Sequence, residues 1–300
     1  LALLPCPGKR GIFGNKPRAG RGFGRDDMAE ERRKKTVLVV VAHADDMEFM
    51  AAGTVARFIR DFGYPVYEYI LTDNSRGSYR LSGPELVEVS AEEARAAGRI
   101  LGLEEVRLEG YPDGELDRVP PGELRGKIMA MIREVRADIV MGWDPFAPYE
   151  DHPDHRAAAM ATLEAAAFAS NPLFYPEHAA PPHMPTEAYW FAKSPLNARL
   201  FVDISAVMDL KVAALLAHDC QMVLTVDALV REARALGADL PMLENLEEGA
   251  HGSLVEMGIR QHCARVGAEA GLECAEQFRH EKFGMLDMVL GTDFVRPDFA

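Results

Sequence analysis

Two short stretches of the chain concentrate side chains that can bind a metal ion or transfer a proton. In the first, VLVVVAHADDMEF, a run of apolar residues leads directly into one histidine and two aspartates. The second, WDPFAPYEDHPDHRAA, carries two histidines around a proline and an aspartate. In chain order these residues are His43, Asp45, Asp46, His152, Asp154 and His155. Catalytic zinc sites use three such protein ligands and leave a fourth position for water.

The spacing of the first stretch suits a metal site with a proton acceptor beside it. His43 and Asp46 are three residues apart on an expected strand-to-helix turn, so their side chains can face the same way. One histidine of the second stretch would complete a His/His/Asp ligand set. Asp45 and the other histidine would remain for the two further tasks of a zinc hydrolase, a base for the attacking water and a donor for the developing oxyanion.

The surrounding pattern predicts alternating strands and helices. The expected strands are 36–42, 65–73, 104–110 and 137–143. The expected helices between them are 47–62, 88–102 and 121–136, with a long polar loop at 75–84. Because the first strand is a continuous β-branched run, it is typical of a strand buried on both faces. The alternation indicates an α/β fold, a Rossmann-like doubly wound and mostly parallel sheet with helices on both faces.

The second half of the chain is expected to add a helical cap. A helix at 156–169 and a loop rich in proline and histidine precede two short strands, EAYWFA and ARLFVDI. The remaining expected helices are 206–219, 224–236 and 251–270. We therefore expect one domain over residues 35–300. Residues 1–34 are expected to be a disordered basic extension, since they are rich in Gly, Pro and Arg without periodicity.

Each of the two polar stretches also has a purely structural interpretation. Aspartate is a favoured N-cap residue, so the first could simply begin a helix, and the second could be a surface turn. Both follow predicted strands, however, and ligands bind outside the carboxyl ends of strands in open α/β sheets. The combination favours one active site. No GxGxxG follows the first strand, which argues against dinucleotide binding.

Charge and cysteine content exclude several classes of partner. The formal net charge is −14, so we expect no nucleic acid and no anionic membrane surface as partner. Four scattered cysteines without a CxxC pair indicate free thiols and a cytoplasmic location. No apolar run approaches the roughly 20 residues that a membrane helix needs.

The motifs of the chain resemble those of a known family. AHADD followed by Gly53 and Thr54, and later HPDHR, are similar to the two signatures of the PIG-L/LmbE-like zinc-dependent N-deacetylases. LTDNSRGS, LGLEEVRLEGYPDGEL, DLKVAALLAHDCQ and GAEAGLECAEQFR resemble further family segments, so the resemblance covers roughly residues 36–280. LSGPELVEV and the loop before HPDHR look most similar to the branch that deacetylates N-acetylglucosamine and diacetylchitobiose.

The resemblance implies a role for each residue of the two motifs. It makes His43, Asp46 and His155 the ligands of Zn²⁺ and Asp45 the general base. It makes His152 the group that stabilises the oxyanion or assists proton transfer, with Asp154 orienting it. It also places Asp113 where relatives hydrogen-bond sugar hydroxyls.

The chain departs from the family pattern at three positions. Ala44 and Met47 stand where the first motif usually has Pro and Glu, and neither change removes a ligand. Ser90 stands where relatives commonly have an arginine that contacts the sugar, so we expect either a different substrate or a cation supplied by Arg76 or Arg80 instead. A further substrate-binding candidate is His218, whose alternative interpretation is a histidine at a helix end.

These observations predict an enzyme. The expected reaction is metal-dependent hydrolysis of an N-acetyl group from a small amino-sugar substrate, releasing acetate and a free amine, by a homo-oligomer. One alternative is a zinc amidase that acts on a non-sugar N-acyl conjugate, which the presence of Ser90 motivates. Another is a protein that binds metal or sugar without catalysis. It is disfavoured because Asp45 is present as a base and only three ligands are visible.

Overall fold

The computed structural model describes residues 34–238, 246, 250–291 and 296–299. The predicted basic extension, residues 1–34, therefore lies outside the described residues except for Lys34, which is exposed and belongs to no helix or strand. Among the described residues no single helix is long and apolar enough to cross a membrane. Ser205–Leu216 and Asp219–Ala235 meet that test only as a pair, which is bent by 87°.

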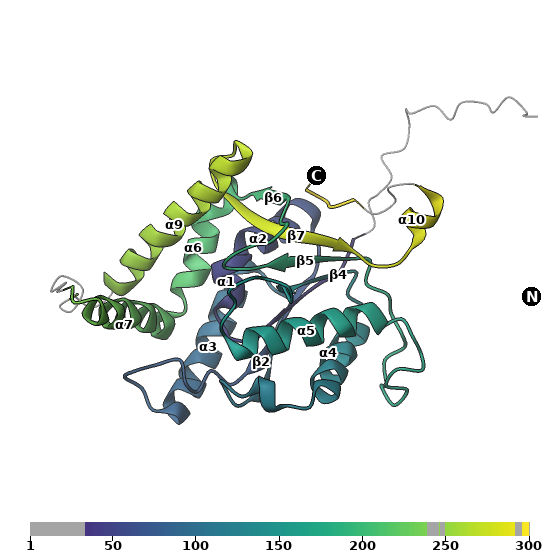
Figure 1. Ribbon diagram of the computed structural model, residues 1–300, viewed down its shortest axis with the longest axis horizontal. Helices are drawn as coiled ribbons and strands as arrows, with labels where there is room; N and C mark the ends of the chain where they lie inside the picture. Colours follow the sequence, from purple (N-terminus) through teal and green to yellow (C-terminus); the bar gives the residue numbers. More distant parts are fainter. Residues whose placement is uncertain (1–33, 239–245, 247–249, 292–295, 300) are drawn as a thin grey trace, which may run out of the picture. The chain divides into compact units, whose positions relative to one another are not determined.

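The described residues form a seven-stranded sheet in the order β3-β2-β1-β4-β5-β7-β6 (Figure 1). Its strands are β1 (Val37–Val41), β2 (Val66–Thr72), β3 (Glu105–Tyr111), β4 (Ile139–Trp143), β5 (Glu187–Phe191), β6 (Leu200–Asp203) and β7 (Ala275–Lys282). The strands β1 to β5 pair in parallel, whereas β7 is antiparallel to both β5 and β6. The predicted fold class, a mostly parallel sheet of the α/β type, is confirmed.

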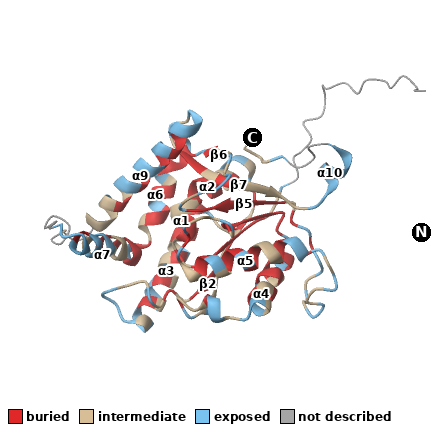
Figure 2. Cartoon of the chain, viewed as in Figure 1, coloured by how far each residue is buried: buried red, intermediate tan, exposed pale blue. Residues whose placement is uncertain are grey.

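Helices cover both faces of this sheet. On one face lie α1 (Asp46–Met50), α2 (Ala52–Phe62), α3 (Gly83–Leu101), α6 (Met208–Leu216), α7 (Asp219–Ala235) and α9 (Ala250–Ala270). On the other lie α4 (Pro121–Val135) and α5 (Pro153–Phe168). The short elements are η1 (Leu116–Arg118), η2 (Ser205–Val207) and α10 (Leu286–Leu290). Buried residues run along the strands and the inward sides of the helices (Figure 2).

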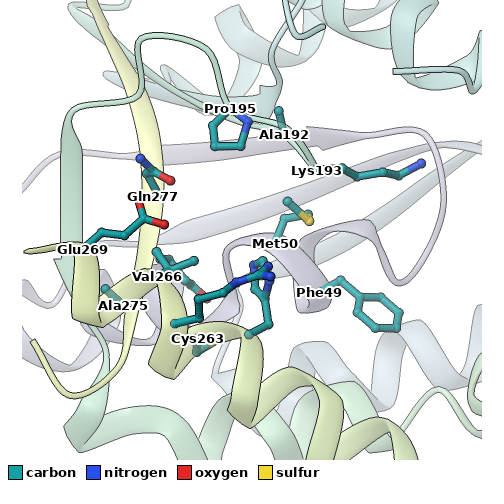
Figure 3. Close-up of a pocket in the computed structure, with 13 residues that line it drawn as sticks. Phe49, Met50, Ala192, Lys193, Pro195, Cys263, Val266, Glu269, Ala275 and Gln277 are labelled. Atoms are coloured by element: carbon teal, nitrogen blue, oxygen red, sulfur yellow. The ribbon is translucent and has the colours of Figure 1, made fainter. Parts of the chain in front are cut away.

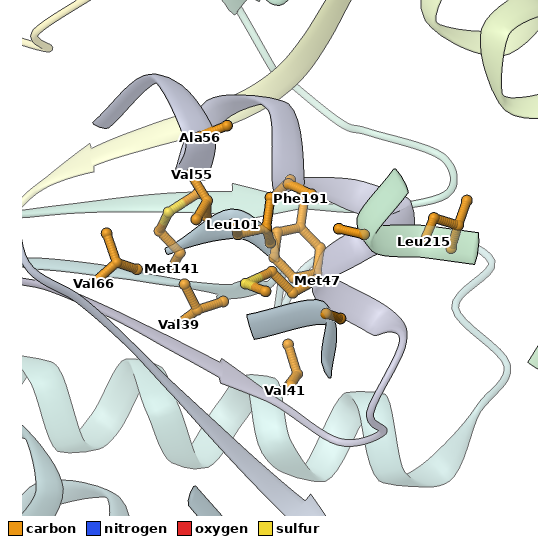
Figure 4. Packing of buried hydrophobic residues seen from close by; sticks show 14 of the residues in the cluster. Val39, Val41, Met47, Val55, Ala56, Val66, Leu101, Met141, Phe191 and Leu215 are labelled. Carbon is orange, nitrogen blue, oxygen red and sulfur yellow. The ribbon is translucent and has the colours of Figure 1, made fainter. Parts of the chain in front are cut away.

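Strand β1 divides its side chains between two hydrophobic cores. Val37, Val39 and Val41 join a cluster with α1, α2 and α6, part of which Figure 4 shows around Val39 and Val41. Leu38 and Val40 join the cluster under α4 and α5. Successive side chains of a strand point to opposite faces, so a strand covered on both sides must be apolar throughout. This explains the uninterrupted apolar run that precedes His43.

The helix predicted for residues 47–62 is two helices, because a buried ion pair occupies a break at Ala51. Lys211 Nζ donates to the carbonyl oxygens of Glu48 and Phe49, at the end of α1, and lies 2.7 Å from Glu276 Oε1. The Glu276 carboxylate accepts hydrogen bonds from the backbone of Gly53 and Thr54, at the start of α2. The pair thus satisfies backbone groups that both helix ends leave unbonded.

Two further sequence predictions are corrected. Helix α3 begins at Gly83 rather than at 88, because Ser82 donates its backbone N–H and its hydroxyl to Glu85 and so caps the helix. No strand was expected after residue 204, yet β7 lies between β5 and β6. The polar side chains of β7 do not give the pattern of a strand in the sequence, because the residues that pair with them are distant along the chain. Arg279 pairs with Asp144, and His280 lies 2.8 Å from Glu187.

Candidate metal centre and its pocket

A pocket of about 470 Å³ opens where β1, β2, β3 and β4 end, and we call it the candidate pocket. It is lined by His43, Asp45, Asp46, Asn74, Arg76, Gly77, Tyr79, Asp113, Gly114, His152, His155, Gln221 and Leu224. The loops that follow four strands of a parallel sheet thus meet at one edge, which brings the two polar stretches after β1 and β4 together as expected. The three predicted metal ligands line this pocket together with Asp45 and His152.

Three donor atoms in the candidate pocket have the separations of a metal site. His43 Nδ1 lies 3.1 Å from His155 Nε2, and His155 Nε2 lies 3.3 Å from Asp46 Oδ1. The third side of the triangle, His43 Nδ1 to Asp46 Oδ1, measures 3.7 Å. Tetrahedral zinc with bonds of about 2.0–2.2 Å separates its ligand atoms by roughly 3.3–3.6 Å. The three separations, from 3.1 to 3.7 Å, lie within about 0.2 Å of this range, so the donor set fits a zinc ion.

The backbone of the strand-to-helix turn fixes the orientation of Asp46. Its Oδ2 accepts hydrogen bonds from the backbone N–H groups of Ala42 and His43, at 3.0 and 2.9 Å. Trp143 Nε1 donates to the same oxygen at 2.9 Å. Because Oδ2 is bound by three donors, Oδ1 is the oxygen that faces the two histidines.

A carboxylate lies beside the second nitrogen of each of the two candidate ligand histidines. His43 Nε2 lies 3.2 Å from Asp113 Oδ1 and 3.4 Å from Asp154 Oδ2. His155 Nδ1 lies 3.0 Å from Glu150 Oε1. Carboxylates placed behind the outer nitrogen of a histidine fix its tautomer and raise the basicity of the nitrogen that binds metal. The arrangement presents His43 Nδ1 and His155 Nε2 to the metal position.

Two other residue groups could also gather around an ion. His43, His152 and His155 place one donor each within 4.8 Å of one another, and so do His43, Asp113 and Asp154. His152 Nδ1, however, accepts a hydrogen bond from the backbone N–H of Asp154 at 3.2 Å. The Asp154 carboxylate is likewise engaged by the backbone N–H groups of Gly114 and Leu116. The triangle of His43, Asp46 and His155 is therefore the donor set we favour.

Asp45 and His152 stand beside this triangle with different charge properties. Burial, and next the adjacent carboxylate of Asp46, raise the pKa of Asp45 to about 6. Burial, and next the neighbouring imidazoles of His43 and His155, lower the pKa of His152. Since Nδ1 of His152 accepts a hydrogen bond, its neutral form carries the proton on Nε2. The pocket thus combines a carboxylate with a neutral imidazole donor.

The structure gives Asp154 a different partner from the predicted one. Its carboxylate binds the loop before η1, accepting from Gly114 N at 2.6 Å and Leu116 N at 2.9 Å. Only its backbone N–H contacts His152. Asp113 lines the pocket as expected, but its two oxygens face His43 Nε2 and the backbone N–H of Arg76. Both carboxylates therefore support His43.

The predicted substrate-binding cations are both paired. Arg76 lines the pocket, but its guanidinium donates to Glu115. Arg80 makes two hydrogen bonds to Asp227, at 2.8 and 2.6 Å, and does not line the pocket. Ser90 is buried in α3, where its hydroxyl points to the carbonyl oxygen of Val87 at 3.4 Å.

His218 is buried behind the pocket rather than in its lining. It precedes α7, and its Nε2 lies 3.5 Å from Glu48 Oε2. Burial opposes charging of this imidazole, but the carboxylate of Glu48 outweighs burial and raises its pKa. His218 does not line the pocket, so its role in substrate binding stays a prediction.

Several residues of the centre were not predicted from the sequence. Glu150, behind His155, lies in the second motif stretch but has no spacing that would single it out. Trp143, the last residue of β4, stacks on His155 with ring centres 4.0 Å apart. Asn74 Oδ1 accepts the backbone N–H of Ala44, a bond that a proline at this position could not make.

A second cavity, of about 310 Å³, lies at the end of α1 (Figure 3). Its walls come from α1, the β5–β6 loop, α9 and β7, and include Met50, Lys193 and Gln277. None of the predicted site residues lines it. Lys193 contacts both this cavity and the surroundings of the candidate metal centre. It lines the cavity, and its Nζ lies 3.3 Å from Glu150 Oε1.

Comparison with known proteins places this pocket in a family. The sequence model of PIG-L, described as GlcNAc-PI de-N-acetylase, matches residues 38–166. Diacetylchitobiose deacetylase of Thermococcus kodakarensis is 35% identical over 193 residues, which cover 62% of this chain and 70% of that protein. The chain belongs to the PIG-L family. A probable N-acetyl-alpha-D-glucosaminyl L-malate deacetylase 2 of Bacillus anthracis is 30% identical over 183 residues, covering 56% of this chain and 80% of that one.

Solved structures show the same PIG-L architecture. N,N'-diacetylchitobiose deacetylase from Pyrococcus horikoshii aligns with a TM-score of 0.68 at 24% identity, covering 85% of this chain and 89% of that one. The conserved protein TT1542 from Thermus thermophilus aligns with a TM-score of 0.63 at 25% identity, covering 88% of this chain and all of that one. The family resemblance predicted from AHADD and HPDHR is confirmed.

Proposed function

We propose that this PIG-L family chain is a zinc-dependent N-deacetylase that releases acetate and a free amine from a small amino-sugar substrate. N-acetylglucosamine conjugates and diacetylchitobiose are the first candidates, because the named relatives act on such compounds. The observation that carries the proposal is the triangle of His43, Asp46 and His155, which is open to a pocket that also contains Asp45.

The metal would be held by His43 Nδ1, Asp46 Oδ1 and His155 Nε2. When bound there, zinc would polarise the amide carbonyl and lower the pKa of a water molecule. Two nitrogens and one carboxylate oxygen are a donor set that zinc accepts readily. The carboxylates of Asp113, Asp154 and Glu150 would keep both imidazoles in the tautomer that presents the correct nitrogen.

Asp45 would move the proton of the reaction. Its carboxylate would accept a proton from the attacking water and pass it to the amide nitrogen as the C–N bond breaks. A pKa of about 6 suits both steps, because the group is ionised at neutral pH and still basic enough to hold the proton briefly. Water and amide are consumed, and acetate and amine are released.

His152 would stabilise the negative charge that develops on the carbonyl oxygen. Its Nδ1 is occupied by the Asp154 backbone N–H, so Nε2–H is the donor available to the substrate. A neutral donor held in place before the reaction needs no reorganisation when the charge appears.

A non-sugar N-acyl conjugate is the second candidate substrate. It is favoured by the pairing of Arg76 with Glu115 and of Arg80 with Asp227, because neither guanidinium is left for an anionic or polyhydroxylated group.

The test is amine and acetate release from N-acetylglucosamine and diacetylchitobiose, with N-acetylated thiol conjugates and amino acids as the non-sugar panel. Protein loaded with zinc is compared with chelator-treated protein and with treated protein after zinc is restored. Chelator-sensitive release from the sugars supports the proposal. Release from the non-sugar panel alone would replace it with the second candidate, and no chelator-sensitive release from any compound would contradict both.

The cellular setting is a separate proposal. We propose a cytoplasmic location, supported by the free thiols of Cys220, Cys263 and Cys274, and a homo-oligomeric state. Sedimentation equilibrium of the full chain would measure the association state, and a monomer at micromolar concentration would contradict that part.

A further inference from the structure

One wall of the candidate pocket is a loop that is fastened to a helix from the other half of the chain. Residues 75–82, between β2 and α3, extend beside α7 (Figure 1). Arg80 makes two hydrogen bonds to Asp227, at 2.8 and 2.6 Å. Gln221 Nε2 donates to the carbonyl oxygen of Gly77 at 3.3 Å. These contacts join the wall to one side of α7.

Tyr79 is the aromatic residue of this wall. It lines the candidate pocket, and 53% of its surface is exposed. The guanidinium carbon of Arg231, also on α7, lies 3.9 Å from the centre of its ring. An arginine stacked on one face of an aromatic ring restricts the orientation of that ring. Tyr79 is therefore held in place even though its side chain is exposed.

The position of Tyr79 suits a sugar ring that is not itself deacetylated. The donor triangle and Asp45 occupy the end of the pocket formed by β1 and β4, whereas Tyr79, Gln221 and Leu224 come from the loop and α7. Binding pockets combine apolar and aromatic surface with a few polar groups that fix orientation. Tyr79 and Leu224 supply apolar surface here, and the Gln221 amide supplies a polar group.

We propose that Tyr79 determines specificity for the part of the substrate beyond the acetylated ring, by stacking against the apolar C–H face of a second sugar. The contacts from α7 hold Tyr79 for this purpose, with Asp227 and Arg231 acting as positioning residues. The inference rests on the proposed function, because it assigns the second ring of an amino-sugar disaccharide.

The test compares a disaccharide with a monosaccharide. We expect Tyr79→Ala to lower the ratio of kcat/KM for diacetylchitobiose to that for N-acetylglucosamine by about tenfold, mainly through a higher KM for the disaccharide. Tyr79→Phe keeps the ring and should restore the ratio. The matched control is Leu81→Ala, in the same loop but outside the pocket lining, which should leave the ratio unchanged.

Binding without turnover separates this inference from the proposed function. In an Asp45→Asn background, calorimetry with diacetylchitobiose should give a dissociation constant about tenfold higher when Tyr79 is replaced by alanine. An unchanged ratio and an unchanged dissociation constant would overturn the role of Tyr79, and so would an equal effect of Leu81→Ala. If the unsubstituted zinc protein releases no amine from either sugar while Tyr79→Ala still weakens binding, the proposed reaction fails and the binding role stands.

Discussion

In each histidine of the candidate metal centre, the two ring nitrogens have different partners. His43 and His155 turn one nitrogen toward Asp46 Oδ1 and the other toward a carboxylate behind it. His152 differs, since its Nδ1 accepts a backbone N–H and its Nε2 remains for the substrate. Whether a histidine can act as a metal ligand or as a hydrogen-bond donor thus depends on the group that contacts its other ring nitrogen, a carboxylate or a backbone N–H.

The adjacent aspartates should respond differently to substitution. We expect Asp45→Asn to keep zinc and to lose at least about 100-fold in turnover, because the amide cannot accept the proton of the attacking water. Metal content by atomic absorption and acetate release measure the two effects. Asp46→Asn is the matched control, and it should lose zinc because Asp46 supplies the ligand oxygen. Equal zinc loss in both variants would show that Asp45 is a ligand.

Zinc binding should depend on pH through His155. Burial opposes its charged form, but the carboxylates of Asp46 and Glu150 outweigh burial and raise its pKa to about 9 in the metal-free protein. Below that pH a proton competes with the metal, so apparent affinity should fall at least about tenfold for each unit of acidification. Calorimetry at pH 7 in buffers of different ionisation enthalpy should detect release of at least one proton. Binding without proton release would contradict this protonation state.

At the scale of elements, the loop between β4 and α5 supports the metal centre from behind. Glu150 contacts His155 Nδ1 at 3.0 Å and accepts the backbone N–H of His152. The loop therefore supplies His152 and the carboxylate that orients His155, which stands in the first turn of α5.

Loss of the Glu150 charge should weaken metal binding. We expect Glu150→Gln to reduce zinc affinity about 10- to 100-fold, because a neutral amide does not raise the basicity of His155 as a carboxylate does. Competition with a zinc-sensitive dye measures the change. Asp151→Asn is the control, since Asp151 is the exposed neighbour in the same loop and faces Lys193 only at 3.6 Å. If both variants bind zinc equally well, Glu150 has no such role.

At the scale of the whole molecule, the C-terminal strand holds the turn that carries the metal ligands. Glu276, on β7, binds the start of α2 and pairs with Lys211, which binds the end of α1. Asp45 and Asp46 stand at the beginning of α1. A contact between residues more than 200 positions apart therefore secures the helix that follows the first motif.

Removal of this contact should destabilise the fold. We expect Glu276→Ala to lower the free energy of unfolding by about 3–5 kcal/mol, because it leaves the buried Lys211 ammonium without its counter-charge. Urea unfolding followed by circular dichroism measures the change. Glu273→Ala, two positions before β7 and exposed, should change stability by less than about 0.5 kcal/mol. Similar losses in the two variants would refute the role of Glu276.

The sequence by itself determined the class of fold, and it proposed the members of the candidate metal centre. The alternation of apolar strands with amphipathic helices depends on local periodicity, which is readable along the chain. The motif around His43 and the motif around His155 follow two predicted strands, and the topology of a parallel sheet brings such ends together. For this reason a His/His/Asp set could be proposed before any distance was known, and the resemblance to the family selected His155 over His152 as its second histidine.

Only the tertiary structure decided how these residues are supported. The break at Ala51, the strand β7 and the pairing of Glu150 with His155 depend on partners that no local pattern links. The same holds for the side chains of Arg76 and Arg80, which were expected to replace the arginine absent at Ser90 but which face Glu115 and Asp227. Buried polar groups must find partners wherever the packed chain supplies them, so their contacts are properties of the fold.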